Sequence, residues 1–332
     1  MIREGVNMNI SIIGSGAYGL ALGTLVISNK DNKLKMWTFD ENEQNMLAVQ
    51  RKSIRFDGYE VPENIFFTMS LEEAMKDTEL VVMAIPGVAF EKMSIEVSKY
   101  LTEKQHVLIA TKGIDNKNSE LFSDVFLKYN PNAKISVMSG PSFAEDIIKG
   151  SYIGFTLASK FEESNDVVIK AFNNPKNIIK VINDMVGIQI CSAIKNVVAL
   201  GSGILSGMDE TPSTIALFLT NAINNIKDLI DCLGGDRETI LSYAGFGDYV
   251  MTTTSNESRN YSYGYMIGKG KNKDELESYL KSQTVEGVYT LDSINKIIKT
   301  KNLKMPIIEV LYGIIRENGK KEDILSFLIS NK

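Results

Sequence analysis

The stretch Asn9-Ile10-Ser11-Ile12-Ile13-Gly14-Ser15-Gly16-Ala17-Tyr18-Gly19 indicates the fold class of this 332-residue chain. Its first five residues form a compact, mostly apolar run that predicts a buried strand, and residues 17–28, rich in Ala and Leu, predict a helix. The glycines between them have the spacing G-x-G-x-x-G, which permits a sharp bend, close approach of the backbone to a pyrophosphate, and tight packing of helix on strand. The stretch therefore predicts a dinucleotide-binding βαβ unit with residues 14–19 as its cofactor turn. The alternative is a merely tight strand-to-helix turn.

The end of the next predicted strand, residues 33–39, bears on which dinucleotide is bound. An acidic group at this point can bind the ribose 2′-hydroxyl of NAD, whereas an arginine can accept the 2′-phosphate of NADP. The strand ends in Phe39-Asp40-Glu41 with no arginine directly after it, and the nearest cation is Lys35. We therefore predict NAD as the cofactor, with NADP possible. Asp40 could instead only cap the helix predicted over residues 41–47.

Strand and helix signals alternate through the first half of the chain. Further strands are predicted over residues 80–85, 107–110, 134–138, 154–157 and 178–181. Such alternation predicts parallel strands joined by right-handed crossovers, with ligands bound beyond the carboxyl ends of the strands. The tails at those ends are Phe39-Asp40, Pro86-Gly87, Thr111-Lys112-Gly113 and Ser139-Gly140-Pro141-Ser142.

Beyond about Gly187 the pattern changes to long helical stretches. Helices are predicted over residues 192–205, 213–232, 239–241, 273–280, 288–298 and 307–317. We therefore expect an α/β protein with an amino-terminal Rossmann-type doubly wound sheet (residues 1–188) and a mainly α-helical carboxyl-terminal domain (residues 189–332). The length also suits two domains.

Composition narrows the function further. A net charge of −5 does not favour nucleic-acid binding, which usually needs a basic face. The single histidine, His106, excludes a histidine-based metal cluster, and two cysteines without a CxxC pair argue against a disulfide framework or a thiolate metal site. No uninterrupted apolar run approaches 18 residues, and Met1–Asn7 show no signal or transit pattern. We expect no metal, no membrane insertion and a cytoplasmic location.

Several further segments identify a family. They are Ala110-Thr111-Lys112-Gly113-Ile114, Ser139-Gly140-Pro141-Ser142-Phe143-Ala144, Ala193-Ile194-Lys195-Asn196-Val197, Gly247-Asp248, Ser258-Arg259-Asn260 and Val285-Glu286-Gly287. In this order they resemble the NAD(P)-dependent glycerol-3-phosphate dehydrogenase family. The resemblance implies a two-domain enzyme, often a homodimer, that transfers hydride between the nicotinamide and C2 of dihydroxyacetone phosphate. Its product, sn-glycerol 3-phosphate, would feed glycerophospholipid synthesis.

The residues themselves offer the groups that this chemistry needs. Reduction of a ketone by hydride builds negative charge on the carbonyl oxygen, so the site needs a proton donor and a fixed positive charge. With no usable histidine, Lys195, placed at the start of the first helix of the second domain, is the candidate general acid, and the resemblance implies the same role. Lys112 is the candidate neighbouring cation. Asp248 would orient Lys195, and Thr252 would share its helical face.

Binding of the substrate phosphate needs convergent donors. Arg259 offers the paired N–H donors of a planar guanidinium group, and Asn260 offers the N–H donors of its side-chain amide. The resemblance implies that the substrate also meets Lys112, Gly140, Ser142, Asn196, Asp248, Thr252 and Ser258. It further implies cofactor contacts from Phe39, Pro86, Lys112, Ala144, Arg259, Val285 and Glu286. Simpler interpretations exist for some of these residues. Lys112 and Lys195 could be solvated surface charges, and Gly140-Pro141-Ser142 could form a turn that binds no ligand.

The chain departs from the family pattern in three places. Cys191-Ser192 stand where the family commonly has two glycines, and residues 209–214 and 220–222 lack its Gly-Asp-Asn-Thr-Lys and Arg-Gly sequences. One alternative is therefore a paralogous dehydrogenase for a related phosphorylated or nucleotide-linked ketone. Another is a non-catalytic NAD-binding sensor or assembly protein, which would not need to retain Lys195, Asp248 and Arg259 together.

Overall fold

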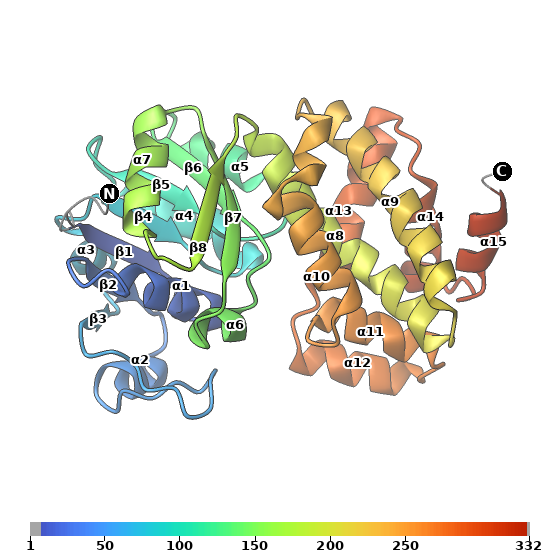
Figure 1. The fold of residues 1–332 in the computed structure, drawn as a ribbon, viewed down its shortest axis with the longest axis horizontal. Helices are drawn as coiled ribbons and strands as arrows, with labels where there is room; N and C mark the ends of the chain where they lie inside the picture. Colours follow the sequence, from blue (N-terminus) through green and yellow to red (C-terminus); the bar gives the residue numbers. More distant parts are fainter. Residues whose placement is uncertain (1–7, 331–332) are drawn as a thin grey trace. The chain divides into compact units, whose positions relative to one another are not determined.

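The protein divides into two compact units. The computed structural model describes residues 8–330, so Met1–Asn7, on which the expected absence of a targeting signal rests, lie outside the described residues. The first unit, called the sheet unit below, reaches to Thr111 and resumes over Phe122–Met185. The second, the helical unit, comprises Lys112–Leu121 and the chain from Val186 onward (Figure 1). We describe each unit by itself.

The sheet unit alternates strands and helices. Its strands are β1 Asn9–Ile13, β2 Lys33–Trp37, β3 Ile65–Thr68, β4 Leu80–Met83, β5 His106–Ile109, β6 Lys134–Ser139, β7 Ile153–Ser159 and β8 Asn177–Val181. Its helices are α1 Ala17–Ile27, α2 Glu41–Ala48, α3 Leu71–Met75, η1 Gly87–Ala89, α4 Phe90–Ser98, α5 Phe122–Tyr129, α6 Ala144–Ile148 and α7 Glu162–Ala171.

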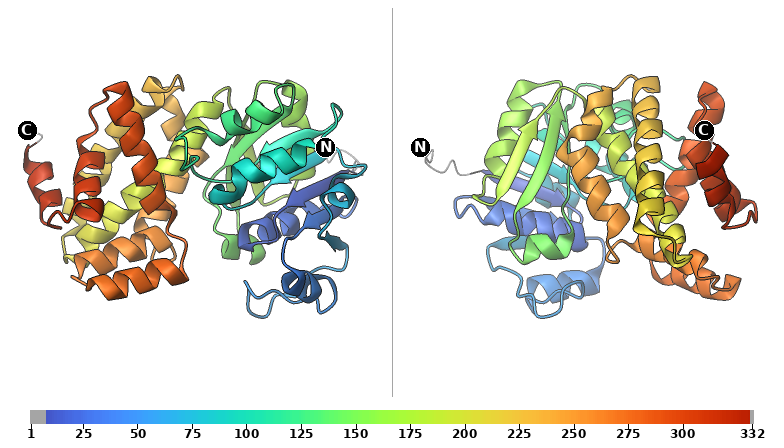
Figure 2. Two further views of the ribbon diagram at one scale, coloured as in Figure 1. Left: turned by 180° about the vertical axis from the view of Figure 1, so that it is seen from behind. Right: turned by 45° about the vertical axis from the view of Figure 1, so that its right-hand side comes forward.

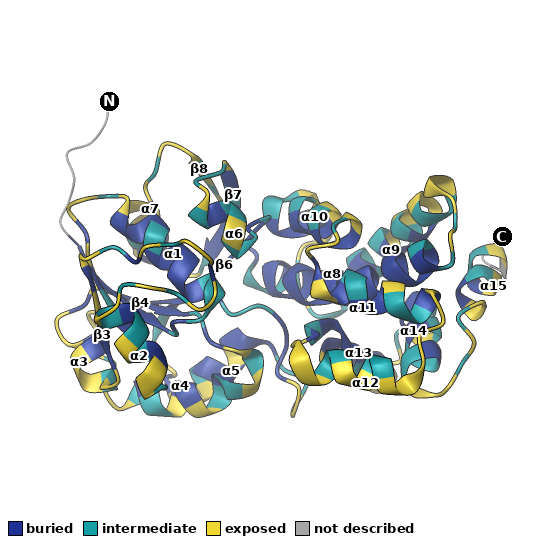
Figure 3. Ribbon diagram, turned by 90° about the horizontal axis from the view of Figure 1, so that it is seen from below, coloured by how far each residue is buried: buried dark blue, intermediate teal, exposed yellow. Residues whose placement is uncertain are grey.

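All eight strands form one sheet in the order β3-β2-β1-β4-β5-β6-β7-β8. Figure 3 shows α1, α6 and α7 along one face of the sheet and α3, α4 and α5 along the other, as in a doubly wound fold. The predicted fold class is therefore confirmed. Strand β3 escaped prediction because it is a four-residue edge strand with little periodicity.

The prediction of a purely parallel sheet is wrong at one pairing. Strand β7 runs antiparallel to β6, with Ser136 opposite Ser159, and β8 then pairs parallel to β7. The right-hand view of Figure 2 shows β7 and β8, in light green, at the edge of the sheet. The connection after β6 holds only the five-residue helix α6. At about 1.5 Å per residue this helix is too short to carry the chain back along the strand, so the chain turns and returns beside β6.

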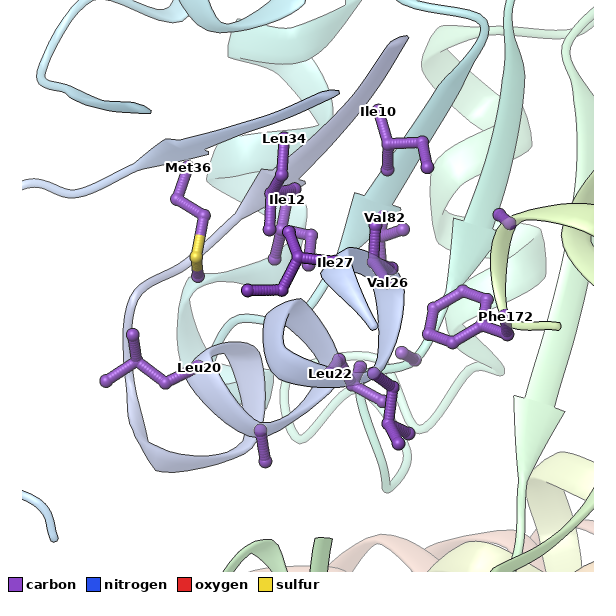
Figure 4. Close-up of a cluster of buried hydrophobic side chains, with 14 of the residues drawn as sticks. Ile10, Ile12, Leu20, Leu22, Val26, Ile27, Leu34, Met36, Val82 and Phe172 are labelled. Carbon is purple, nitrogen blue, oxygen red and sulfur yellow. The ribbon is translucent and has the colours of Figure 1, made fainter. Parts of the chain in front are cut away.

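The core of the sheet unit explains why the glycine turn is held firmly. Side chains from β1 and β2 alternate inward and meet the buried face of α1. Figure 4 shows them together with Phe172, which follows α7. The buried residues labelled there are Ile10, Ile12, Leu20, Leu22, Val26, Ile27, Leu34, Met36, Val82 and Phe172, each at most 9% exposed. This packing fixes both ends of the turn between β1 and α1.

The helical unit contains no strand among its described residues. Its helices are α8 Met185–Gly207, α9 Pro212–Cys232, η2 Arg237–Leu241, η3 Tyr243–Gly247, α10 Asp248–Thr254, α11 Arg259–Gly268, α12 Lys273–Ser282, α13 Glu286–Lys301, α14 Pro306–Arg316 and α15 Asp323–Ser330. Helices α11 and α15 were not predicted, and α10 was expected only through the shared helical face of Asp248 and Thr252.

Helix α8 is the central element of this unit. Its apolar residues pack with those of α9, α13 and α14 in one buried cluster, and Figure 3 shows it largely in the buried colour. Among the described helices it alone is long and apolar enough to cross a membrane by composition, and its apolar window is entirely buried within the protein. A core helix passes the same test, and α8 is built as a core helix.

The segment Lys112–Leu121 groups with the helical unit, whereas the sequence predicted domain limits of 1–188 and 189–332. The reason is hydrophobic, because Ile114 and Leu121 are buried in the same cluster as α8. The sequence pattern placed these residues by their position after β5, whereas burial of their apolar side chains decides where they pack. As a result Lys112 is held in the unit that contains Lys195.

Candidate functional site

The glycine turn of the sheet unit has the form that a pyrophosphate needs. Gly14 has a φ of 117°, a conformation that L side chains rarely adopt, and a side chain there would meet the carbonyl oxygen of Ala84. A Cβ at Gly16 would meet no atom within 4 Å, so the backbone faces open space at this residue. Helix α1 begins directly after Gly16 without a side-chain cap or an acidic residue in its first turn. The turn thus fits a dinucleotide, whose pyrophosphate the N–H groups of α1 would hold.

The carboxyl end of β2 has two distinct parts. Phe39 is 75% exposed and presents an aromatic face beyond the strand. Asp40, by contrast, caps α2, and its carboxylate accepts a hydrogen bond of 2.7 Å from the backbone N–H of Glu43. The structure therefore shows the helix cap that the sequence left open as an alternative for Asp40.

The remaining residues predicted in the sheet unit lie at other carboxyl ends of strands. Gly140 packs so closely on β7 that a side chain would meet the carbonyl oxygen of Gly154. The Ser142 hydroxyl donates to the Gly140 carbonyl (2.9 Å) and lies 3.2 Å from the Tyr18 hydroxyl. Pro86 caps η1 after β4. Ala144 is the first residue of α6.

In the helical unit three predicted residues form one buried charge cluster. The Lys195 Nζ donates to the Asp248 Oδ1 at 2.6 Å and to the Thr252 hydroxyl at 3.1 Å. The Lys112 Nζ lies 3.3 Å from the other carboxylate oxygen of Asp248. Asp248 is fully buried and Lys195 is 5% exposed. One carboxylate therefore bridges two ammonium groups and fixes the position of both.

Local sequence explains how these residues are brought together. Lys195 lies in the middle of α8, not at the start of a helix as predicted. Asp248 begins α10 after the π-helical turn Tyr243–Gly247, in which Gly245 has a non-helical backbone (φ −85°, ψ −105°). A side chain at Gly245 would meet the backbone of Ile240. This tight turn aims Asp248 at α8, and π-turns are frequent at functional sites.

Burial gives Lys195 the acidity of a useful proton donor. It lowers the pKa of this lysine from its ordinary 10.5 to about 8, and the charge of Lys112 lowers it as well. The negative charges of Asp248 and, to a smaller extent, Glu286 raise the pKa of Lys195. A lysine with this pKa can both donate and accept a proton near neutral pH.

Two asparagines fix the amino-terminal ends of neighbouring helices. The amide of Asn260, in the first turn of α11, donates to the Asn196 side chain on α8 (3.0 Å) and accepts from the backbone N–H of Gly287 on α13 (2.8 Å). Ser258 caps α11 by accepting from the N–H of Tyr261. Arg259, which is exposed, is thereby held at the start of α11 and close to α8.

The start of α13 carries the last predicted residues. Val285 is buried as the cap residue of α13, and Glu286 follows it, half-buried. Burial raises the pKa of the Glu286 carboxyl. The positive charges of Arg259, Lys195 and Lys112, in decreasing order of effect, lower it by less. Glu286 therefore lies within electrostatic reach of the cluster around Asp248.

The sequence analysis missed three residues beside these sites. Glu43 is 8% exposed and contacts Ser15 in the glycine turn, and Arg55 lies 3.6 Å from the Glu43 carboxylate. The Ser192 hydroxyl, one helical turn before Lys195, is buried and makes no hydrogen bond within the described part of the chain. Only the departure from the family pattern at Cys191-Ser192 could have drawn attention to Ser192.

His106 has a structural role in the sheet unit. It begins β5, is 7% exposed and pairs with the Ser164 hydroxyl at 2.8 Å. Burial lowers the pKa of its imidazole. Among residues 8–330, no three His, Cys, Asp or Glu side chains form a group that could hold a metal ion.

Comparison with known proteins agrees with this geometry. Residues 9–165 match the family profile described as the NAD-dependent glycerol-3-phosphate dehydrogenase N-terminus, and residues 184–326 match the corresponding C-terminus. A glycerol-3-phosphate dehydrogenase (NAD(P)+) from Fusobacterium nucleatum is 31% identical over 97% of this chain and 96% of its own length. The glycosomal NAD+ enzyme of Leishmania mexicana is 31% identical over 96% and 89%. The solved glycerol-3-phosphate dehydrogenase of Coxiella burnetii superposes with a TM-score of 0.91 at 25% identity, covering 97% of this chain and 99% of that one.

A Rossmann-type sheet with an open glycine turn and a second unit with a buried, acidified lysine define an NAD(P)-dependent oxidoreductase. The chain belongs to the NAD-dependent glycerol-3-phosphate dehydrogenase family. The family predicted from the sequence motifs, and NAD(P) as its cofactor, are thereby confirmed.

Proposed function

We propose that this protein catalyses the reversible reduction of dihydroxyacetone phosphate to sn-glycerol 3-phosphate, with NADH preferred over NADPH. The observation that carries the proposal is the buried cluster in which Asp248 bridges Lys195 and Lys112. It combines a proton donor with a fixed positive charge, which are the two groups that reduction of a ketone needs. The relatives in Fusobacterium nucleatum and Leishmania mexicana are glycerol-3-phosphate dehydrogenases, which supports the same substrate.

In this mechanism the glycine turn and the start of α1 would hold the dinucleotide, which when bound would supply the hydride for C2. Lys195 in its ammonium form donates a proton to the developing alkoxide oxygen, and its neutral amine takes that proton back in the oxidation direction. Lys112 polarises the carbonyl, and Asp248 keeps both ammonium groups in position. The low exposure of Lys195 and Asp248 keeps water from weakening these charges.

The pH profile should report the state of Lys195. Because the protonated form is the donor, kcat/KM for reduction should be constant below pH 8 and fall tenfold per pH unit above its pKa of about 8. The oxidation of glycerol 3-phosphate needs the neutral amine, so its kcat/KM should rise up to the same pH and then level. Initial rates in both directions between pH 6 and 10 test this. The absence of an inflection up to pH 10, which the ordinary lysine pKa of 10.5 would give, would contradict it.

Arg259 is proposed to bind the substrate phosphate. Arg259→Ala should raise KM for dihydroxyacetone phosphate by about 10- to 100-fold, since it removes charge-assisted hydrogen bonds worth about 1.5–3 kcal/mol each. Unphosphorylated dihydroxyacetone should be reduced equally well by both forms, and Arg237→Ala, an exposed arginine of the same unit, should leave KM unchanged. An unchanged KM in Arg259→Ala would assign the phosphate to other donors.

The experiment that tests the function is a rate comparison. NADH oxidation is followed with dihydroxyacetone phosphate and with a panel of other phosphorylated and nucleotide-linked ketones. Activity with another ketone and none with the first would establish the paralogous dehydrogenase. Cofactor binding without turnover of any ketone would establish the sensor.

The assembly and location belong to the same proposal. We propose a cytoplasmic homodimer. The dimer is supported by the family resemblance and by exposed apolar side chains in the helical unit, namely Leu217, Leu241, Phe246 and Val250. The location is supported by two cysteines that are not joined in a disulfide. Light scattering after gel filtration, and cell fractionation, test the two statements.

A further inference from the structure

A buried carboxylate reaches the glycine turn from the second helix. The Glu43 Oε2 accepts hydrogen bonds from the hydroxyls of Ser15 (3.1 Å) and Thr38 (3.4 Å). Ser15 belongs to the glycine turn after β1, and Thr38 directly follows β2. The Glu43 carboxylate therefore lies between the carboxyl ends of β1 and β2. In dinucleotide-binding folds, an acidic residue at this place accepts a hydrogen bond from the 2′-hydroxyl of the ribose next to the adenine.

The groups that the sequence put forward for this task are engaged elsewhere. Asp40 caps α2. The Lys35 Nζ donates to the backbone carbonyls of Glu73 (3.0 Å) and Lys76 (2.8 Å) at the end of α3. Both side chains are therefore bonded to partners outside the glycine turn.

A cation that sequence order did not reveal is held beside Glu43. Arg55, in the segment between α2 and β3, lies 3.6 Å from Glu43 Oε1, and its side chain is 47% exposed. Its guanidinium is the group that could accept a 2′-phosphate, but the ion pair ties it to the carboxylate. The two residues therefore form a pair in which the carboxylate restrains the arginine beside it.

We propose that Glu43, not Asp40, selects NAD over NADP in this protein, and that Arg55 is a phosphate-binding group which Glu43 holds in check. The inference rests on the proposed dehydrogenase function and deepens it. The carboxylate accepts a hydrogen bond from a ribose 2′-hydroxyl, and it repels a 2′-phosphate at the same position.

The test measures cofactor affinity without substrate. Glu43→Gln keeps the shape of the side chain and an oxygen that can accept from Ser15 and Thr38, and it removes the charge. By calorimetry, the ratio of Kd for NADPH to Kd for NADH should fall at least about tenfold, because repulsion is lost and Arg55 is released. The double variant Glu43→Gln/Arg55→Ala should lose most of this gain in NADPH binding.

Two further variants make the test decisive. Asp40→Asn should leave the Kd ratio as it is, whereas a ratio that moves with Asp40 and not with Glu43 would overturn the proposal. Arg55→Ala, at a largely exposed position, leaves the Glu43 charge unpaired and more repulsive to a 2′-phosphate, so it should weaken NADPH binding several-fold and leave NADH binding unchanged. An equal effect on both cofactors would also overturn it. If the Kd values shift as expected and no ketone is reduced, the proposed function fails while the assignment of Glu43 stands.

Discussion

Lys195→Met is expected to lower kcat for the reduction of dihydroxyacetone phosphate by about 10²- to 10⁴-fold, the usual contribution of a positioned general acid. Methionine has nearly the same length but carries no proton to donate. The glycine turn proposed to hold the dinucleotide belongs to the other unit of the chain, so Kd for NADH should change little. Steady-state rates and calorimetric titration with NADH measure the two quantities.

A matched control separates catalysis from a general effect of losing a lysine. Lys301→Met, at the exposed end of α13, should retain full kcat. The retention of more than a tenth of kcat in Lys195→Met would remove this lysine from the proton transfer. A folding defect would appear as a loss of helical circular dichroism and of NADH binding together.

Asp248→Asn is expected to have the second largest effect, a loss of kcat of about 10²-fold or more. The Asp248 charge raises the pKa of Lys195 against the effect of burial. Without this charge the pKa of Lys195 falls further below 8, so at neutral pH less of the lysine carries the proton that reduction needs. The inflection in the pH profile of kcat/KM should therefore move to lower pH.

The same substitution should also destabilise the helical unit. Two lysines would share a buried site without a counter-charge, and breaking a buried ion pair costs about 3–5 kcal/mol. Urea unfolding measures this cost. Thr252→Val, which removes only a neutral partner of Lys195, is the control and should move the inflection little. An inflection that stays in place in Asp248→Asn would show that Asp248 does not tune Lys195.

Prediction from the sequence succeeded where a pattern is local. The glycine spacing after β1 predicted a turn whose backbone only glycine adopts, and Gly14 has that conformation. Helical periodicity placed Asp248 and Thr252 on one face, and both contact Lys195. Prediction failed where pairing is non-local, as in the antiparallel β7 and the edge strand β3. The residues of β7 do not specify the direction in which it pairs, and the four residues of β3 do not by themselves predict a strand.

The chain's order of motifs was enough to determine the family, the Rossmann-type sheet and the identity of Lys195 as a candidate proton donor, because each depends on residue types at fixed local spacings. Packing alone decided that Lys112 joins the helical unit through Ile114 and Leu121, where a single buried carboxylate can hold it beside Lys195. Packing likewise placed Glu43 against Ser15. Such contacts join residues far apart in the chain. They are decided by the burial of apolar surface and the pairing of buried charges, and the spacing of residues along the sequence does not predict them.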